Sequence, residues 1–299
     1  MFRFRQAVLS IRLALALLLA LALPATGLLA APLARHVIII SMDGMRPDAI
    51  TDRTMPIVDR LKVRGAYTLE ARTTLPSVTL VSHASMLTGA RPDVHGVTWN
   101  TETAQGPLKV PTILTIASQH GFSTALVTAK MRLSQLVPDR KVTRFVKAGW
   151  TSATVAKAAC KLLKEEKPGL MLVHLIDPDS AGHKDGFMSE GYLKAATATD
   201  RAVAQVLAAI SEAGLKSDTL VIVTADHGGK TGTKRHGSKH PQDVLIPWFV
   251  VGPGVREGQH LRHPVSTVDT AATALWALGI ELPAHMTGRP VAEAFAAAR

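Results

Sequence analysis

Three apolar, strand-like runs of this 299-residue chain each lead into side chains that can bind a metal ion. These side chains are aspartates and histidines: Asp43, Asp179, His183, Asp226 and His227. Another donor, His236, follows in a short glycine-containing loop. Aspartate oxygen and imidazole nitrogen are the ligands of hydrolytic Zn²⁺ and Mn²⁺ sites. The pattern predicts a metal centre, and the number of donors suits two ions rather than one.

The runs that carry these donors are short and rich in β-branched residues, which is typical of strands buried on both faces of a parallel sheet. In open α/β sheets, ligands bind at the carboxyl ends of the strands, which is where these donors lie. Strand-like runs alternate with helix-like segments such as 151–164 and 190–213. The chain is therefore predicted to be an α/β protein with a central, mostly parallel sheet and helices on both faces. Pro247, within the predicted strand 245–251, indicates an edge strand or an irregular start.

A hydroxyl-rich segment lies between the first two donor groups, and it includes Thr79 and Ser82. Its second half has a helical pattern that ends at Gly89, so Thr79 is expected near a helix amino terminus. Backbone N–H groups and the helix dipole favour anions there. A hydroxyl at this point, bound to a metal, could ionise and attack phosphorus. The alternative is that both residues merely cap the helix.

Taken in order, these segments resemble the alkaline phosphatase superfamily, in particular its type I phosphodiesterase/nucleotide pyrophosphatase family. The matching stretches are 41–44, 79–89, 179–183, 226–228 and 236–237. The resemblance implies an alkaline-phosphatase-like fold. Only eight residues separate His227 from His236, so no large cap insertion is expected at that point.

The resemblance also implies roles for individual residues. The residues around one zinc ion would be Asp43, Thr79, Asp226 and His227. The residues around a second zinc ion would be Asp179, His183 and His236. Thr79 would be the nucleophile and would pass through a phosphothreonine intermediate, which water then cleaves. Ser82, three residues further on, is the candidate donor to a phosphoryl oxygen, and Mn²⁺ accepts the same metal ligands as Zn²⁺.

The leading hypothesis is a metal-dependent phosphohydrolase that cleaves phosphodiester or pyrophosphate bonds in a small phosphate ester. Phosphomonoester or phosphonate hydrolysis at the same site is the alternative, because the short segment 228–235 leaves the site open. A non-catalytic, metal-dependent binding protein is disfavoured, since all the metal donors and the nucleophile are present. Sulfatase chemistry is disfavoured too, because 79–83 lacks the Cys/Ser-x-Pro-x-Arg pattern.

The amino terminus has the pattern of a secretory signal peptide. Arg3, Arg5 and Arg12 are followed by an unbroken apolar run over 13–23. We therefore expect a signal peptide over 1–31, a single catalytic domain over 32–299, and a periplasmic or secreted protein. An uncleaved leader that anchors the protein is the alternative, and it would be the protein's membrane contact.

The composition narrows the range of partners. The formal net charge is +11, but the cations are scattered and aromatic residues make up only 4% of the chain, so no specific nucleic-acid partner is expected. A basic surface suits small anionic substrates. Cys160 is the only cysteine, which excludes an intrachain disulfide and a thiolate metal site. The sequence leaves the oligomeric state open.

Overall fold

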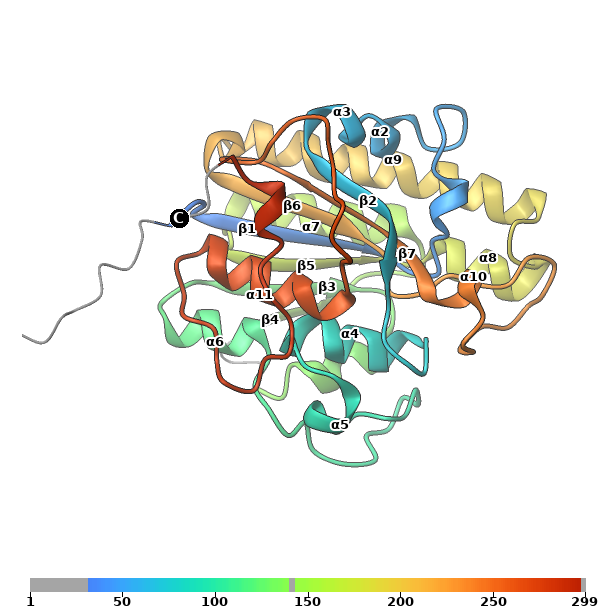
Figure 1. Ribbon diagram of the computed structural model, residues 1–299, viewed down its shortest axis with the longest axis horizontal. Helices are drawn as coiled ribbons and strands as arrows, with labels where there is room; N and C mark the ends of the chain where they lie inside the picture. Colours follow the sequence, from blue (N-terminus) through green and yellow to red (C-terminus); the bar gives the residue numbers. More distant parts are fainter. Residues whose placement is uncertain (1–31, 140–142, 297–299) are drawn as a thin grey trace, which may run out of the picture. The chain divides into compact units, whose positions relative to one another are not determined.

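The structure is a computed structural model that describes residues 32–139 and 143–296. Within that part of the chain, a sheet of eight strands has the order β4-β3-β5-β1-β6-β7-β2-β8 (Figure 1). The strands are β1 His36–Met42, β2 Ala66–Arg72, β3 Thr124–Thr128, β4 Thr143–Lys147, β5 Leu170–Leu175, β6 Thr219–Thr224, β7 Leu245–Val251 and β8 Gln259–His260. β7 runs antiparallel to both of its neighbours, and the other pairs are parallel. The predicted mostly parallel sheet is confirmed.

Helices cover both faces of the sheet, as predicted. In Figure 1, α4, α6 and α11 lie in front of the sheet, and α7 and α9 lie behind it. The bounds of these helices are α4 Thr79–Thr88, α6 Ile113–Gln119, α7 Ser152–Glu165, α9 Glu190–Glu212 and α11 Thr267–Ala277. The shorter α-helices are α2 Pro56–Asp59, α3 Leu61–Arg64, α5 Pro92–His95, α8 Asp177–Asp185 and α10 Pro241–Val244. Four short 3₁₀ helices are also described: η1 Pro47–Ala49, η2 Met131–Leu136, η3 Lys216–Asp218 and η4 Ala292–Ala294.

Local sequence explains where the longer helices begin. Thr151 caps α7 in a capping box with Thr154, and Ser189 accepts a hydrogen bond from Tyr192 N at the start of α9. Both helices are amphipathic, and they bury apolar stripes against each other and against the sheet. This burial fixes the strands that carry the donor residues.

Of the two alternatives for Pro247, the irregular start agrees with the structure and the edge strand is wrong, because β7 lies inside the sheet. It pairs with β6 on one side and with β2 on the other. The pairing with β2 is interrupted between Thr68 and Ala71, at the level of the proline. Because the register shifts there, the missing N–H of Pro247 leaves no gap in a regular ladder.

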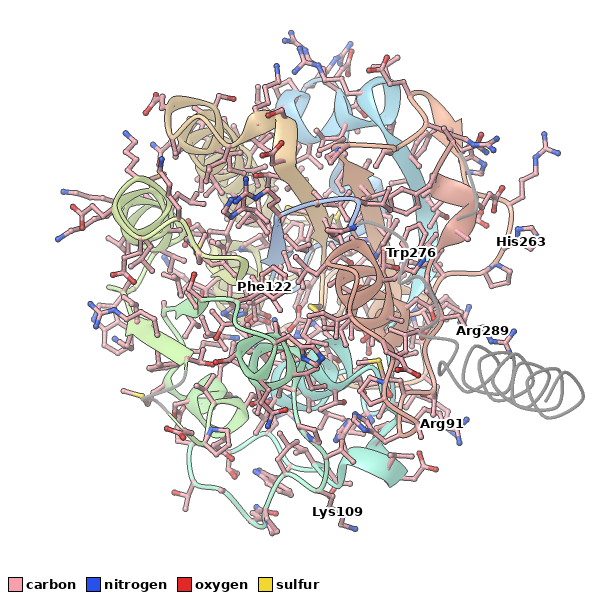
Figure 2. The ribbon with its side chains drawn as sticks, turned by 90° about the vertical axis from the view of Figure 1, so that its left-hand side faces the viewer. Arg91, Lys109, Phe122, His263, Trp276 and Arg289 are labelled. Carbon is pink, nitrogen blue, oxygen red and sulfur yellow. The ribbon has the colours of Figure 1, made fainter. Side chains whose placement is uncertain are left out.

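The side chains that could bind a metal ion lie at one end of the sheet, the carboxyl end of its central strands. Every residue of β5 and β6 is buried, and the middle of each strand is apolar; the polar side chains of these strands, such as His174 and Thr224, lie near their ends. The side at which the parallel strands begin, viewed in Figure 2, carries residues such as Phe122 and Trp276, and charged side chains such as Arg289 project outward from it. The opposite end, where the strands finish, holds the aspartates and histidines.

The predicted signal peptide over 1–31 lies outside the described residues. None of the helices described here is both long and apolar enough to cross a membrane.

Candidate active site

The first group of donors lies at the ends of two neighbouring central strands. Asp43, Asp226 and His227, here named the inner cluster, follow β1 and β6. His227 Nε2 lies 3.3 Å from Asp43 Oδ1 and 3.4 Å from Asp226 Oδ2. All three side chains are fully buried. Because β1 and β6 are adjacent and parallel, their ends hold these residues at a fixed separation.

The second group, here named the outer cluster, consists of Asp179, His183 and His236. Asp179 and His183 are four residues apart on α8, so they share one face of the helix. Asp179 Oδ1 lies 3.3 Å from His183 Nε2 and 3.4 Å from His236 Nε2, and the two imidazole nitrogens are 3.2 Å apart. The side chain of His183 is 48% exposed, so this cluster reaches solvent. The rings of His227 and His236 stack with centroids 3.7 Å apart, which joins the two clusters.

The three imidazoles of the clusters are oriented in the same way. Nδ1 faces a backbone carbonyl oxygen in each: His183 with Lys234 at 2.8 Å, His227 with Gly228 at 2.8 Å and His236 with Ser77 at 2.9 Å. A carbonyl oxygen only accepts, so Nδ1 donates in each ring, and Nε2 is the atom at which a metal ion could bind after losing any proton that it holds. Metal-ligating histidines have this arrangement, because the carbonyl fixes both tautomer and ring orientation.

Four buried polar atoms of the clusters have no hydrogen-bond partner within the described residues. They are Asp43 Oδ1, Asp179 Oδ1, Asp226 Oδ2 and His227 Nε2. Buried polar atoms are normally paired, so four that lie close together indicate a missing ligand. Two sets of donors have ligand atoms within 4.8 Å of one another, Asp43 with Asp226 and His227, and Asp179 with His227 and His236. The residues fit divalent cations.

The inner cluster carries an excess of negative charge. Burial raises the pKa of Asp226 well above its ordinary value, and the neighbouring carboxylate of Asp43 raises it further. Burial would lower the pKa of His227, but Asp226 and Asp43 raise it to about 10. Without a cation the site therefore holds protons, which metal ions would displace on binding.

Lys130 supplies the positive charge within the clusters. It lies two residues after β3, and its Nζ is 2.5 Å from Asp43 Oδ2 and 2.6 Å from Asp179 Oδ2. Burial would lower the pKa of Lys130, but these two carboxylates raise it above its usual value, so the side chain is an ammonium. The same Nζ donates to Thr79 Oγ1 at 3.3 Å. The Lys130 ammonium thus contacts one carboxylate of each cluster and the Thr79 hydroxyl.

Thr79 is the first residue of α4, where the sequence placed it. Val78 precedes the helix, and its side chain makes no capping hydrogen bond. The Thr79 hydroxyl faces Lys130, and no described contact has it accept from the helix backbone. The Thr79 hydroxyl is therefore directed at Lys130 and not at the helix backbone.

Ser82 has a different partner from the one expected. Its side chain is fully buried, and its Oγ accepts a hydrogen bond from Thr73 Oγ1 at 2.9 Å. Asn100, which the sequence analysis did not single out, reaches the start of α4 instead. Its Oδ1 accepts from Leu80 N at 2.9 Å, which holds the amide at the residue after Thr79.

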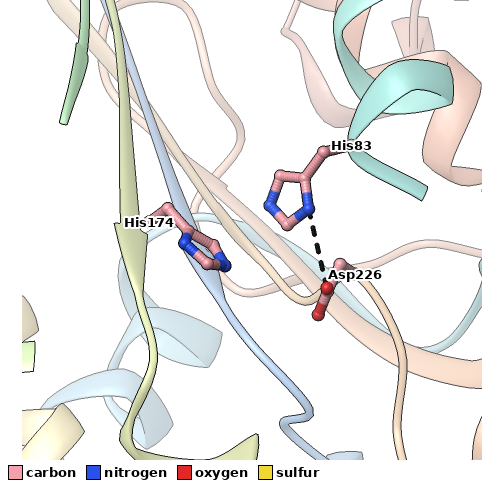
Figure 3. Close-up of side chains that lie close together, drawn as sticks. All are labelled: His83, His174 and Asp226. Atoms are coloured by element: carbon pink, nitrogen blue, oxygen red, sulfur yellow. Dashed lines mark ion pairs between the residues drawn. The ribbon is translucent and has the colours of Figure 1, made fainter. Parts of the chain in front are cut away.

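Two further histidines, His83 and His174, lie beside Asp226 of the inner cluster (Figure 3). Their rings meet almost at right angles, with centroids 4.6 Å apart. His83 faces Thr79 O at 2.8 Å and Ser41 Oγ at 2.9 Å, so both of its nitrogens are paired. His83 is a locally bonded, buried histidine, as expected from its place in the helix.

His174 differs from His83 because one of its partners belongs to the inner cluster. Its Nδ1 lies 2.8 Å from Thr128 Oγ1, and its Nε2 lies 3.0 Å from Asp43 Oδ2. Burial lowers the pKa of His174, so the ring is neutral and donates from Nε2 to the carboxylate. His174 therefore orients Asp43 and is not itself open to an ion.

Two other possible metal donors close to the motifs, Asp177 and His240, lie outside the clusters. Asp177 Oδ1 accepts from Ser152 N at the start of α7, and burial raises the pKa of Asp177. His240 Nδ1 accepts from Gln242 N and caps α10. Both residues serve loop structure, whereas their neighbours Asp179 and His236 face the site.

A family model described as "Type I phosphodiesterase / nucleotide pyrophosphatase" matches residues 37–110 and 119–248. This span includes every residue of both clusters, together with Thr79 and Lys130.

The chain is also similar in sequence to individual proteins whose names include phosphodiesterase or nucleotide pyrophosphatase. Ectonucleotide pyrophosphatase/phosphodiesterase family member 3 of Mus musculus is 25% identical over 226 residues, which cover 64% of this chain and 24% of the relative. Venom phosphodiesterase 2 of Crotalus adamanteus is also 25% identical over 226 residues, covering 64% of this chain and 26% of that protein. The chain thus spans about a quarter of the length of these relatives.

Solved structures of similar fold include sulfatases. A 2-O GAG sulfatase superposes with a TM-score of 0.69 at 16% identity, covering 86% of this chain and 73% of the other. A protein solved with its substrate, D-glucosamine-2-N, 6-O-disulfate, gives a TM-score of 0.70 at 14% identity, covering 86% and 79%. These similarities show the fold, which is alkaline-phosphatase-like.

Proposed function

The chain belongs to the type I phosphodiesterase/nucleotide pyrophosphatase family, and on that premise we propose that it is a metal-dependent hydrolase of phosphodiester or pyrophosphate bonds. The observation that carries this proposal is the convergence of one hydroxyl, one ammonium and six metal donors at the carboxyl end of the sheet. Lys130 Nζ is 3.3 Å from the Thr79 hydroxyl and within 2.6 Å of carboxylates from both clusters.

We assign the inner cluster with Thr79 to one Zn²⁺ and the outer cluster to a second. The unpartnered buried oxygens and the aligned Nε2 atoms support this division, and Mn²⁺ would accept the same ligands. When bound, two such cations supply charge stabilisation to the attacking and leaving oxygens of an in-line displacement. Metal analysis of the purified protein identifies the ions.

Thr79 Oγ is the proposed nucleophile. The Thr79 hydroxyl loses its proton to solvent, a new bond forms between Thr79 Oγ and phosphorus, and the bond from phosphorus to the leaving oxygen breaks. The leaving oxygen departs as an anion or takes up a proton from solvent, and the phosphoryl group is carried on threonine. Water then cleaves the threonine ester, regenerates the hydroxyl and releases the product. Lys130 Nζ, which now donates to Thr79 Oγ1, would supply a positive charge to the phosphoryl group at that hydroxyl, and the Asn100 Nδ2 amide is the candidate hydrogen-bond donor to a phosphoryl oxygen.

A second candidate activity is phosphomonoester hydrolysis, and the position of Lys130 favours it. The phosphoryl group of a monoester is a dianion at neutral pH, so an ammonium next to the nucleophile stabilises it more than it stabilises a monoanionic diester.

The experiment that tests the proposal compares p-nitrophenyl esters with one leaving group. The metal-analysed protein is assayed with p-nitrophenyl phosphate and with p-nitrophenyl ethyl phosphate. Faster hydrolysis of the diester supports the phosphodiesterase assignment, whereas much faster hydrolysis of the monoester moves the assignment to the second candidate. No turnover of either ester by protein that contains its metal contradicts both.

We further propose that residues 32–299 form a single catalytic domain that is exported behind a signal peptide over residues 1–31. The basic leader and the apolar run of the sequence support this. Cell fractionation followed by amino-terminal sequencing tests it, because retention of residues 1–31 in the membrane fraction would indicate an anchor.

A further inference from the structure

A pocket of about 380 Å³ adjoins the outer cluster on the side of the loop between β6 and α10. Its lining includes Lys230, Lys234 and Arg235, together with His236 and Asp243. His236 lines this pocket and also belongs to the outer cluster, where its Nε2 lies 3.4 Å from Asp179 Oδ1. The pocket and the outer cluster therefore share one residue and are adjacent.

The loop that carries the three cations is held in place at several points. Arg46 donates to Gly229 O at 3.0 Å and to Thr231 Oγ1 at 2.8 Å. Phe187 N donates to Thr233 O at 2.9 Å, and His183 Nδ1 donates to Lys234 O at 2.8 Å. A loop fixed in this way presents its charged side chains from a defined backbone.

The cations of this pocket are not paired with carboxylates. No ion pair within 4.0 Å is formed by Lys230, Lys234 or Arg235 in the part of the chain that the structure describes, whereas Arg46, Arg144 and Lys164 elsewhere each face an acid.

The single carboxylate in the lining, Asp243, is buried, and its Oδ2 accepts from Ser238 N and Oγ. Three exposed cations against one buried carboxylate give the pocket a positive potential next to the reaction site.

We propose that this pocket binds a second anionic group, a carboxylate or a phosphate, carried by the same substrate whose phosphoryl group reacts at Thr79. This inference rests on the proposed hydrolase function and names the substrate class that the site prefers: phosphate esters with another negative charge on the alcohol. Arg235 can bind either anion through two parallel N–H donors, and Lys234 and Lys230 add charge without demanding one geometry.

The test uses three p-nitrophenyl phosphodiesters whose second alcohol carries an ethyl, a carboxyethyl or a phosphoethyl group. The wild-type protein is expected to have a kcat/KM about tenfold higher for the two anionic esters than for the ethyl ester, and this ratio should fall with added salt. In the double variant Lys234→Gln/Arg235→Gln the ratio is expected to fall to about one. Lys157→Gln/Arg53→Gln removes the same charges from exposed positions elsewhere and should keep the wild-type ratio.

The result separates the two proposals. Turnover of all three esters without any preference for an added charge overturns the pocket assignment and leaves the hydrolase function standing. Absence of turnover with every ester contradicts the hydrolase function itself. A preference for the phosphoethyl ester alone identifies phosphate as the group bound, and an equal preference for both anionic esters identifies charge as the feature recognised.

Discussion

The inner and outer clusters use the same kinds of side chain but are built differently. The inner cluster stands at the ends of β1 and β6, is fully buried, and is supported by His174 from the neighbouring β5. The outer cluster takes its donors from a short helix and a loop, and His183 is half exposed. We infer that the strands determine the chemistry, whereas the helix and loop determine what can approach it.

The largest effect is expected from a change within the inner cluster. Asp226→Asn removes a buried charge that no other group replaces, so turnover of the preferred ester should fall by about a thousandfold and metal content should drop. Asp218→Asn is a matched control, because it makes the same change just before the other end of β6. Steady-state rates and elemental analysis check both variants. Retention of full activity in Asp226→Asn would show that the inner cluster is not a metal site.

A smaller effect is expected in the outer cluster. His183→Ala should lower activity by about a hundredfold at low metal concentration, since two donors of that cluster remain. Because the position is open to solvent, added Zn²⁺ or Mn²⁺ should restore part of the loss, which it should not do for Asp226→Asn. His263→Ala, an exposed histidine paired with Glu293, serves as the control. If added metal restores the activity of His183→Ala and Asp226→Asn to the same extent, the two clusters do not differ in their access to solvent metal ions.

A substitution of His174, which orients the proposed ligand Asp43, should reduce metal binding less than a substitution of a ligand. His174→Phe removes the hydrogen bond to Asp43 Oδ2, so the affinity for metal should fall by about tenfold. His174→Gln retains an N–H donor at a similar reach and is expected to recover most of that loss. The measurement is a competition titration with a metal chelator. If both variants lose affinity equally, His174 acts through packing and not through its N–H group.

The smallest effect is expected for Ser82→Ala. Its hydroxyl is fully buried and accepts from Thr73, so its removal should change kcat/KM by less than about threefold. A loss of a hundredfold would restore Ser82 as a direct donor to the phosphoryl group.

Much of this arrangement could be predicted from the sequence, because strand ends and donor types leave a local signature. Asp43 and Asp226 each follow a run of apolar residues, and the spacing of Asp179 and His183 fits one face of α8. The parallel order of the central strands then brings these ends together.

Other features of the site and the sheet depend on contacts between residues far apart in the sequence, and no local sequence pattern predicts these contacts. The sequence pattern did not indicate Lys130, which follows β3, because lysine is not among the metal-binding residue types that mark the other strand ends. Its position at a strand end was the signal that could have identified it. Asn100 belongs to no strand or helix, and Pro247 is tolerated inside the sheet only because β2 shifts register opposite it.

The most direct test of the account is to trap the covalent intermediate. The metal-loaded protein is mixed with its preferred p-nitrophenyl ester, quenched in acid within one turnover and analysed by peptide mass spectrometry. We predict a phosphoryl adduct on the peptide that contains Thr79, which is absent in Thr79→Ala, together with loss of turnover in that variant. Turnover by Thr79→Ala at the wild-type rate, or an adduct on a different residue, would contradict the assignment.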